Sequence, residues 1–423
     1  MNELPVGRRV AQWRVRRNMT QQQFADRLGK SKSWVDKVER GVRRLERVSN
    51  LQEIAATLRI DVQVLLATRP VRPTPVAAGV EGIRMALARY HRESSTGPPV
   101  VDDLQARLNH AEQGYRHARY PMLLASLPGL LDAVREARAI RPGATDSLLV
   151  SVYALIALVL VKVDQGELAW LAADRGMTIA LAIDDPQLVA VATVSLSHAL
   201  RSRGRQRSAL DAALAAAARL GGHKVGGGSS AHPALRGTLL LQAALAAAGG
   251  GDERAARQSL DQAEQIARDL GPDGDGGGSR SSDGGGSGGA GFGGAGSGGA
   301  GSGGEVFGLG GFGPAAVEAA WVVADAALGD INTATARHER LVAGDEWRWL
   351  PPEHRAAYLL DVARVYVLAG DMHRAGRAVL DAERTANSEV YDRPTVRKLV
   401  AAVWRSVDAP ADLAQLAATL HVT

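Results

Sequence analysis

The sequence predicts an all-α protein with a small helical head and a large body of stacked helix pairs. Alanine and leucine recur at helical spacing after residue 100, and no stretch shows strand-like alternation. A glycine also recurs between helix pairs, with an alanine five residues later: Gly204/Ala209, Gly251/Ala256, Gly329/Ala334 and Gly370/Ala375. Glycine ends one helix in a left-handed turn, and alanine lets the next helix pack closely against it. At 423 residues, the chain is long enough for two or three domains.

Composition divides the chain into five segments. We expect a head over residues 1–68, a proline-rich linker over 69–79, solenoid parts over 80–270 and 314–423, and a Gly/Ser-rich loop over 271–313. Prolines favour an extended linker. The loop has too few apolar residues to offset its ordering entropy, so we expect it to be disordered. Its GxGxxG at 289–294 follows no strand and does not indicate a nucleotide site.

The sequence of the head predicts five short helices. Helix 1 covers about residues 6–17, and Thr20 with Gln23 forms a capping box that starts helix 2. Helix 2 ends at Gly29, Ser31 can cap helix 3, and helix 3 ends at Gly41. Two further helices follow near 48–58 and 61–66. The short turn between helices 2 and 3 is typical of a helix-turn-helix unit.

Charge is concentrated in the head. Residues 1–72 contain 16 Lys/Arg and 7 Asp/Glu, a net charge of +9, whereas the whole chain carries +5 and the remainder therefore −4. A basic head on a mildly acidic body indicates that the head binds a polyanion.

The head resembles the Xre-type, lambda-repressor-like family. The matching residues are Thr20, Gln21, Phe24, Ala25, Gly29, Val35, Val38, Glu39 and Gly41. The resemblance implies a DNA-binding domain in which Gln21 contacts the DNA backbone and orients helix 3. It places Ser31, Lys32, Ser33, Trp34 and Lys37 at the interface and Arg40, Arg43 and Arg44 on phosphates. Lysine at base edges favours guanine O6 and N7 acceptors.

Some of these roles have alternatives. Trp34 can pack on a sugar or a thymine methyl group, or lie in a subunit contact. Arg40, Arg43 and Arg44 can instead form a solvated basic edge. By the same resemblance, Glu39 and Arg14 form a structural ion pair and are not site residues. One such helix covers few base pairs, so we expect a homodimer that binds a roughly palindromic operator on double-stranded DNA.

The body predicts helix pairs that resemble tetratricopeptide (TPR) repeats. They fall near 100–139, 145–182, 186–220, 232–270, 314–343, 353–387 and 393–421. The apolar run 148–161 is too short to span a bilayer and predicts a buried helix. The body also resembles those of actinobacterial Xre-type regulators, and its architecture is similar to peptide-sensing regulators of Firmicutes. That resemblance implies a peptide or small-molecule effector in a concave groove; the alternative is a scaffold used only for dimerisation.

Catalytic and metal sites are not indicated. Cysteine is absent, the ten histidines are scattered, and Asp102 and Asp103 are better explained as helix caps than as a carboxylate dyad. We therefore expect no cofactor, no metal and no enzymatic activity. The absence of an apolar N-terminal stretch predicts a cytoplasmic protein without membrane contact. The combined hypothesis is a transcriptional regulator; a protein-interaction adaptor and a DNA-binding antitoxin remain the rival classes.

Overall fold

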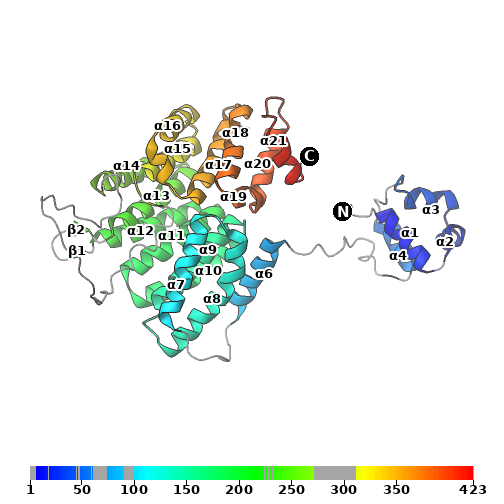
Figure 1. Cartoon of the computed structure of the whole chain (residues 1–423), viewed down its shortest axis with the longest axis horizontal. Coiled ribbons are helices and arrows are strands. Elements are labelled where there is room, and N and C mark those ends of the chain that lie inside the picture. Colours follow the sequence, from blue (N-terminus) through cyan, green and yellow to red (C-terminus); the bar gives the residue numbers. More distant parts are fainter. Residues whose placement is uncertain are drawn as a thin grey trace, which may run out of the picture. The chain divides into compact units, whose positions relative to one another are not determined.

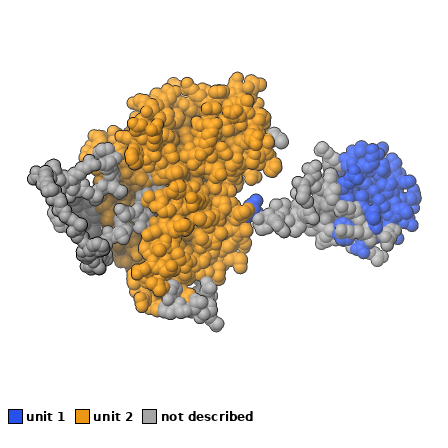
Figure 2. Space-filling view, viewed as in Figure 1, with its two compact units in different colours: residues 1–74 blue, residues 75–423 orange. Residues whose placement is uncertain are grey.

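The computed structural model divides the chain into two compact units, residues 1–74 and 75–423 (Figures 1 and 2). The described residues are 6–17, 19–43, 45, 48–58, 60, 74–89, 100–222, 224–225, 229–230, 232–270 and 311–422. Helices dominate both units. The described strands are the two-residue β1 (Lys224–Val225) and β2 (Ser229–Ser230), which pair antiparallel. The predicted all-α class is confirmed.

The head contains α1 (Val6–Arg16), α2 (Gln21–Leu28), α3 (Lys32–Glu39) and α4 (Val48–Leu58). Their shared core is apolar and almost wholly buried: Val10, Met19, Phe24, Ala25, Val35, Ile54, Ala55 and Leu58. The fifth predicted helix, 61–66, lies outside the described residues. Four of the five predicted helices therefore form around one small core.

Local capping explains where α2 and α3 begin and end. The Thr20 hydroxyl accepts from the Gln23 backbone N–H, and the Gln23 side chain accepts from the Thr20 N–H, as predicted. Gly29 adopts φ +61° and ends α2, and the Ser31 hydroxyl accepts from the Trp34 N–H to start α3. These short-range bonds fix the turn that presents α3.

The body begins with α6 (Pro75–Ala88), so residues 75–79 of the predicted linker are helical instead. Proline is favoured in the first turn of a helix, which places the start at Pro75. A Cβ on Gly79 would lie 2.5 Å from the Leu124 Cβ, so glycine here allows α6 to approach the next helices closely. The linker prediction was wrong for these five residues, while 69–73 lie outside the described part of the chain.

Antiparallel helix pairs follow α6 (Figure 1). They are α7 (Val101–Arg116) with α8 (Tyr120–Ile140), α9 (Asp146–Lys162) with α10 (Gly166–Ile183), α11 (Pro186–Ser202) with α12 (Gln206–Gly222), α13 (Pro233–Gly249) with α14 (Glu253–Leu270), α15 (Pro314–Ala327) with α16 (Ile331–Ala343), and α17 (Pro352–Leu368) with α18 (Met372–Thr385). The short helices η1 (Asp345–Trp349) and α19 (Ser388–Tyr391) are inserted, and α20 (Pro394–Trp404) and α21 (Leu413–Thr419) close the body. The predicted pairs agree with these bounds within a few residues.

The glycine–alanine signal of these pairs has the predicted geometry. The four turn glycines adopt φ between +71° and +93°. The four paired alanines, Ala209, Ala256, Ala334 and Ala375, are fully buried. The turn before α10 lacks this signal because Asp164, at φ +57°, takes the left-handed position. Aspartate is one of the few residues that adopt this conformation at modest cost.

Packing between pairs builds the solenoid. The first helix of each pair contacts that of the next pair, in the order α9, α11, α13, α15 and α17. Residues 148–160 of α9 are all buried, which confirms the buried helix predicted there. None of the described helices is both long and apolar enough to cross a membrane. Of the Gly/Ser-rich loop, only 311–313 are described, and the predicted disorder of 271–310 lies outside the described residues.

Candidate nucleic-acid interface

Helix α3 presents one polar face to solvent because its opposite face is anchored in the head core. Val35 and Val38 are each 1% exposed. The 3.6-residue period then turns Lys32, Ser33 and Lys37 outward, and all three are exposed. Ser33 and Lys37 are four residues apart and share one stripe of the helix. The residues predicted to contact bases therefore lie together on an accessible helix face.

A hydrogen-bonded network behind that face ties α3 to α1 and α2. The Arg14 Nε donates to Glu39 Oε1 at 2.6 Å, and Glu39 Oε2 accepts from Gln21 Nε2 at 2.9 Å. Arg14 also donates from Nη1 to the Met19 carbonyl at 2.6 Å. The predicted Arg14–Glu39 ion pair is therefore present. Gln21 is held by the same carboxylate, which leaves its second amide hydrogen available for a DNA phosphate.

Trp34 makes two contacts within the head that leave both predicted roles open. Its side chain is half-buried and packs against the head core. The Arg43 guanidinium lies 5.9 Å from the centroid of the Trp34 ring, within the range of a cation–π contact. The Arg43 backbone N–H donates to the Lys37 carbonyl at 2.9 Å. Trp34 therefore supports Arg43 beside the end of α3.

Of the other two arginines predicted to contact phosphates, Arg40 is described by the structure and Arg44 is not. Arg40 is exposed and forms a surface ion pair with Asp36, with Nη1 to Oδ2 at 3.4 Å. An exposed pair of this kind is weak and can be exchanged for a phosphate contact. Arg44 lies outside the described residues. Ser31 is exposed, and its hydroxyl is the cap of α3.

The importance of Gly7 is not indicated by any motif in the sequence. A Cβ at this position of α1 would lie 1.9 Å from the Val38 carbonyl oxygen. Val38 is in α3, so α1 and α3 pack backbone against backbone at this point. Only glycine permits that approach, and a family alignment would be needed to detect the requirement from sequence.

Comparison with known families agrees with this geometry. Residues 10–65 match the family model described as Helix-turn-helix. The N-terminal unit is a helix-turn-helix domain. The match begins within α1 and includes α2, α3 and α4, and it supports the predicted Xre-type resemblance and a DNA-binding role for this part of the chain. A search of curated proteins finds no match to the chain.

Among the solved structures that match, two share weak similarity with large parts of the chain. One is Bacillus thuringiensis PlcR in complex with the peptide PapR7 and DNA, at 13% identity and a TM-score of 0.27, covering 63% of this chain and 95% of that one. The other is aspartyl phosphate phosphatase F from Bacillus subtilis, at 12% identity and a TM-score of 0.38, covering 91% and 94%. Scores this low do not establish a shared fold.

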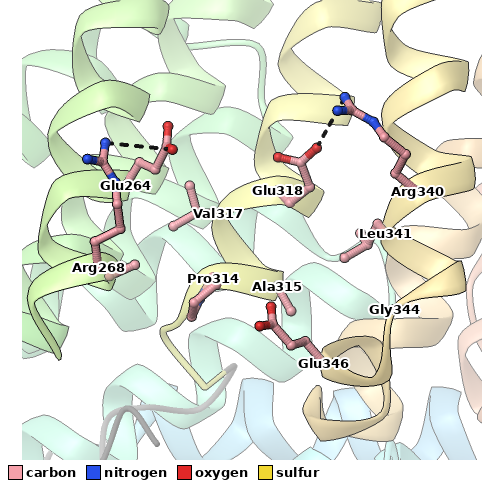
Figure 3. A pocket seen from close by; sticks show the side chains of 11 residues that line it. Glu264, Arg268, Pro314, Ala315, Val317, Glu318, Arg340, Leu341, Gly344 and Glu346 are labelled. Carbon is pink, nitrogen blue, oxygen red and sulfur yellow. Dashed lines mark ion pairs between the residues drawn. The ribbon is translucent and has the colours of Figure 1, made fainter. Parts of the chain in front are cut away.

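The body contains a cavity of about 340 Å³ between α14, α15 and α16 (Figure 3). Its apolar lining comes from Ala267, Pro314, Ala315, Val317 and Leu341. Two ion pairs flank it, Glu264 with Arg268 at 3.7 Å and Glu318 with Arg340 at 3.9 Å. The lining holds three carboxylates, Glu264, Glu318 and Glu346, and two guanidinium groups, so the cavity has no net positive charge to attract an anionic ligand.

Histidine and acidic side chains of the body do not assemble a metal site within the described ranges, where no three potential ligands come together. His338 is buried, and its Nδ1 lies 3.0 Å from the Tyr358 hydroxyl. Burial lowers the pKa of His338 to about 4, so the imidazole is neutral at pH 7. Its role is packing within the α16–α17 interface.

Proposed function

We propose that the chain is a sequence-specific transcriptional regulator that reads DNA through α3. The observation that carries this is the exposed face of Lys32, Ser33 and Lys37 on a helix whose other side is fixed in the core. Lysine ammonium groups at these positions suit guanine O6 and N7 in the major groove. The Arg14–Glu39–Gln21 network holds that face in one orientation, which supports base reading over loose charge attraction.

Phosphate contacts supply the rest of the affinity in this proposal. Gln21, Arg40 and Arg43 lie on the same unit as α3, and Arg43 is supported by Trp34. Such contacts fix register and carry no sequence information. Binding should therefore weaken steeply as salt is raised, while the preferred sequence stays the same.

We further propose that the regulator is a homodimer whose body binds a peptide or small-molecule effector. A single α3 covers only a few base pairs, and two-fold pairing lets a protein of this class read two half-sites. A curved stack of helix pairs offers an extended concave surface for a ligand. The net charge of −4 outside the head makes DNA an unsuitable partner for that surface.

Selection of bound sequences from random duplex DNA by the full chain tests the proposal. We expect enrichment of one motif, an inverted repeat with half-sites about one helical turn apart, roughly 10 base pairs. A single unrepeated half-site would contradict the dimer. Recovery of no motif at low salt, where non-specific affinity is highest, would reject sequence-specific regulation altogether.

A further inference from the structure

A buried polar cluster joins the beginning of the body to its end. We call it the polar clasp; it consists of Tyr115, Tyr120, Lys162, Glu353, Glu389 and Arg393. The Lys162 ammonium pairs with Glu353 and, at 3.0 Å, with Glu389 Oε1. Glu389 also pairs with Arg393 and accepts a hydrogen bond from the Tyr120 hydroxyl. The Tyr115 hydroxyl lies 3.5 Å from Glu353 Oε1.

The clasp is balanced in charge and removed from water. Two cations face two carboxylates, and the Glu389 side chain is fully buried while those of Lys162 and Glu353 are 10% and 7% exposed. Burial alone would lower the pKa of Lys162, but the two carboxylates hold it above its ordinary value. Burial alone would raise the pKa of Glu389, but Lys162 and Arg393 hold it below. Lys162, Glu389 and Arg393 are therefore charged at pH 7.

These contacts are not the ones that a solenoid needs. In a stacked repeat each unit contacts only its neighbours. Here Tyr115 and Tyr120, from α7 and α8, bond to carboxylates 238 and 269 residues away. Helix α7 contacts α17 directly. The clasp therefore closes the stack on itself, in addition to the packing between consecutive pairs.

A second link lies outside the clasp. The Thr395 backbone N–H, at the start of α20, donates to Asp164 Oδ2 at 2.8 Å, and the Asp164 side chain is exposed. Asp164 is also the left-handed residue of the α9–α10 turn. One turn residue thus reaches from the second helix pair to the last helices, across 231 positions of sequence.

The apolar packing between consecutive helix pairs and the polar clasp respond differently when the helices that they join separate. The apolar faces between consecutive pairs lose hydrophobic stabilisation when they separate. In a buried ion cluster, the cost of removing charges from water largely offsets the attraction between them, so exposing the whole cluster to water changes the free energy little. Separating the charged groups of the clasp therefore costs little, and the main cost of opening there comes from the apolar side chains packed around them, such as Val390 and Val396.

We propose that the body has a closed and an open state, that the polar clasp is the contact that opens, and that its opening alters DNA binding by the helix-turn-helix domain. The last part rests on the function proposed above. A ligand that binds the inner surface better in one state would shift the balance between the two by its difference in affinity. The clasp thereby gives the regulator a two-state element for an effector to act on.

Spin-label distances in the full chain test this directly. The chain contains no cysteine, so two introduced cysteines carry the labels at known positions. Asn109→Cys with Lys398→Cys places exposed labels on α7 and α20, across the clasp. Arg207→Cys with Asp261→Cys is the matched control, since it spans consecutive pairs through α12 and α14.

Lys162→Met removes one cation and leaves two buried carboxylates with one partner. We expect the open-to-closed ratio across the clasp to rise by about a hundredfold or more, with the control distance unchanged. Unchanged distances in both pairs would overturn the proposal. Simultaneous broadening of both pairs would also overturn it, because the clasp would then be part of the common core.

Asp164→Gly provides a milder variant that keeps the left-handed turn and leaves the buried charges in place. Loss of its exposed hydrogen bonds should raise the open-to-closed ratio about fivefold. If Lys162→Met does not fold, Asp164→Gly takes its place, and an unchanged ratio in Asp164→Gly then overturns the proposal.

Fluorescence anisotropy with the selected duplex measures whether opening of the clasp alters DNA binding. We expect the affinity of Lys162→Met for this duplex to differ from that of the wild type about fivefold or more. An opened clasp with unchanged affinity rejects the regulatory role alone. Absence of DNA binding by the wild type rejects the proposed function, and the distances still decide whether the clasp opens.

Discussion

Glu112 is a buried carboxyl group that should make the stability of the body depend on pH. It lies in α7, is 6% exposed, and has no hydrogen-bond or ion-pair partner among the described residues. Burial raises its pKa to about 8 from an ordinary 4.5, against a smaller opposing effect of the Arg116 charge. The folded protein therefore holds a proton on Glu112 at pH 7, whereas the unfolded chain does not.

The sign and the size of the effect follow from this difference. Below pH 4.5 both states are protonated and Glu112 has no effect; between 4.5 and 8 the unfolded state alone ionises, and stability falls. Each pH unit is worth about 1.4 kcal/mol, so the full loss is on the order of 5 kcal/mol. Glu112→Gln has no proton to lose. We expect it to stabilise the body by several kcal/mol at pH 8 and by almost nothing near pH 5.

Urea unfolding followed by circular dichroism at pH 5 to 9 measures this difference. Asp103→Asn is the control, because Asp103 lies in the same helix with its side chain 69% exposed. Its profile should run parallel to that of the wild type. If the Glu112→Gln profile is also parallel to the wild type from pH 5 to 8, the carboxylate has found a countercharge and our account of its burial is wrong.

Three further predictions concern the head and the Gly/Ser-rich loop. Gly7→Ala should destabilise the head by about 1–3 kcal/mol, because a Cβ would overlap the α3 backbone; an unchanged melting temperature would show that α1 moves freely. Glu39→Ala should destabilise it by about 3–5 kcal/mol in denaturant titrations, since it leaves the nearly buried Arg14 unpaired, and equal stability would make the network incidental. Excision of residues 273–310 should leave the thermal melt almost unchanged, and a large drop would show that the loop is structured.

Much of the fold was predictable because the signals are local. The glycine–alanine pairs at Gly204, Gly251, Gly329 and Gly370 encode each turn within six residues, and the turns form where predicted. The start of α6 was misplaced because three prolines indicated an extended linker. The last of them, Pro75, instead begins a helix whose Gly79 packs tightly on α8.

The contacts that could not be predicted join residues far apart in the sequence. No local sequence pattern predicts that Lys162 pairs with Glu353 and Glu389, because this pairing depends on how the whole stack of helices curves. In the head, the outward face of α3 was predictable from helical periodicity. The packing of Trp34 under Arg43 was not, because it depends on the backbone path after Gly41.

Base reading by Lys32 and Lys37 underlies the proposed function, and the ratio of affinities for specific and non-specific DNA measures it. Fluorescence anisotropy of the full chain would compare its selected duplex with a scrambled duplex of equal length, at several salt concentrations. We expect Lys32→Ala and Lys37→Ala each to lower the ratio about 5- to 150-fold, which corresponds to about 1–3 kcal/mol. Arg43→Ala should instead weaken binding to both duplexes alike and reduce the salt dependence. If both lysine variants keep the wild-type ratio, α3 does not read the sequence and the account fails.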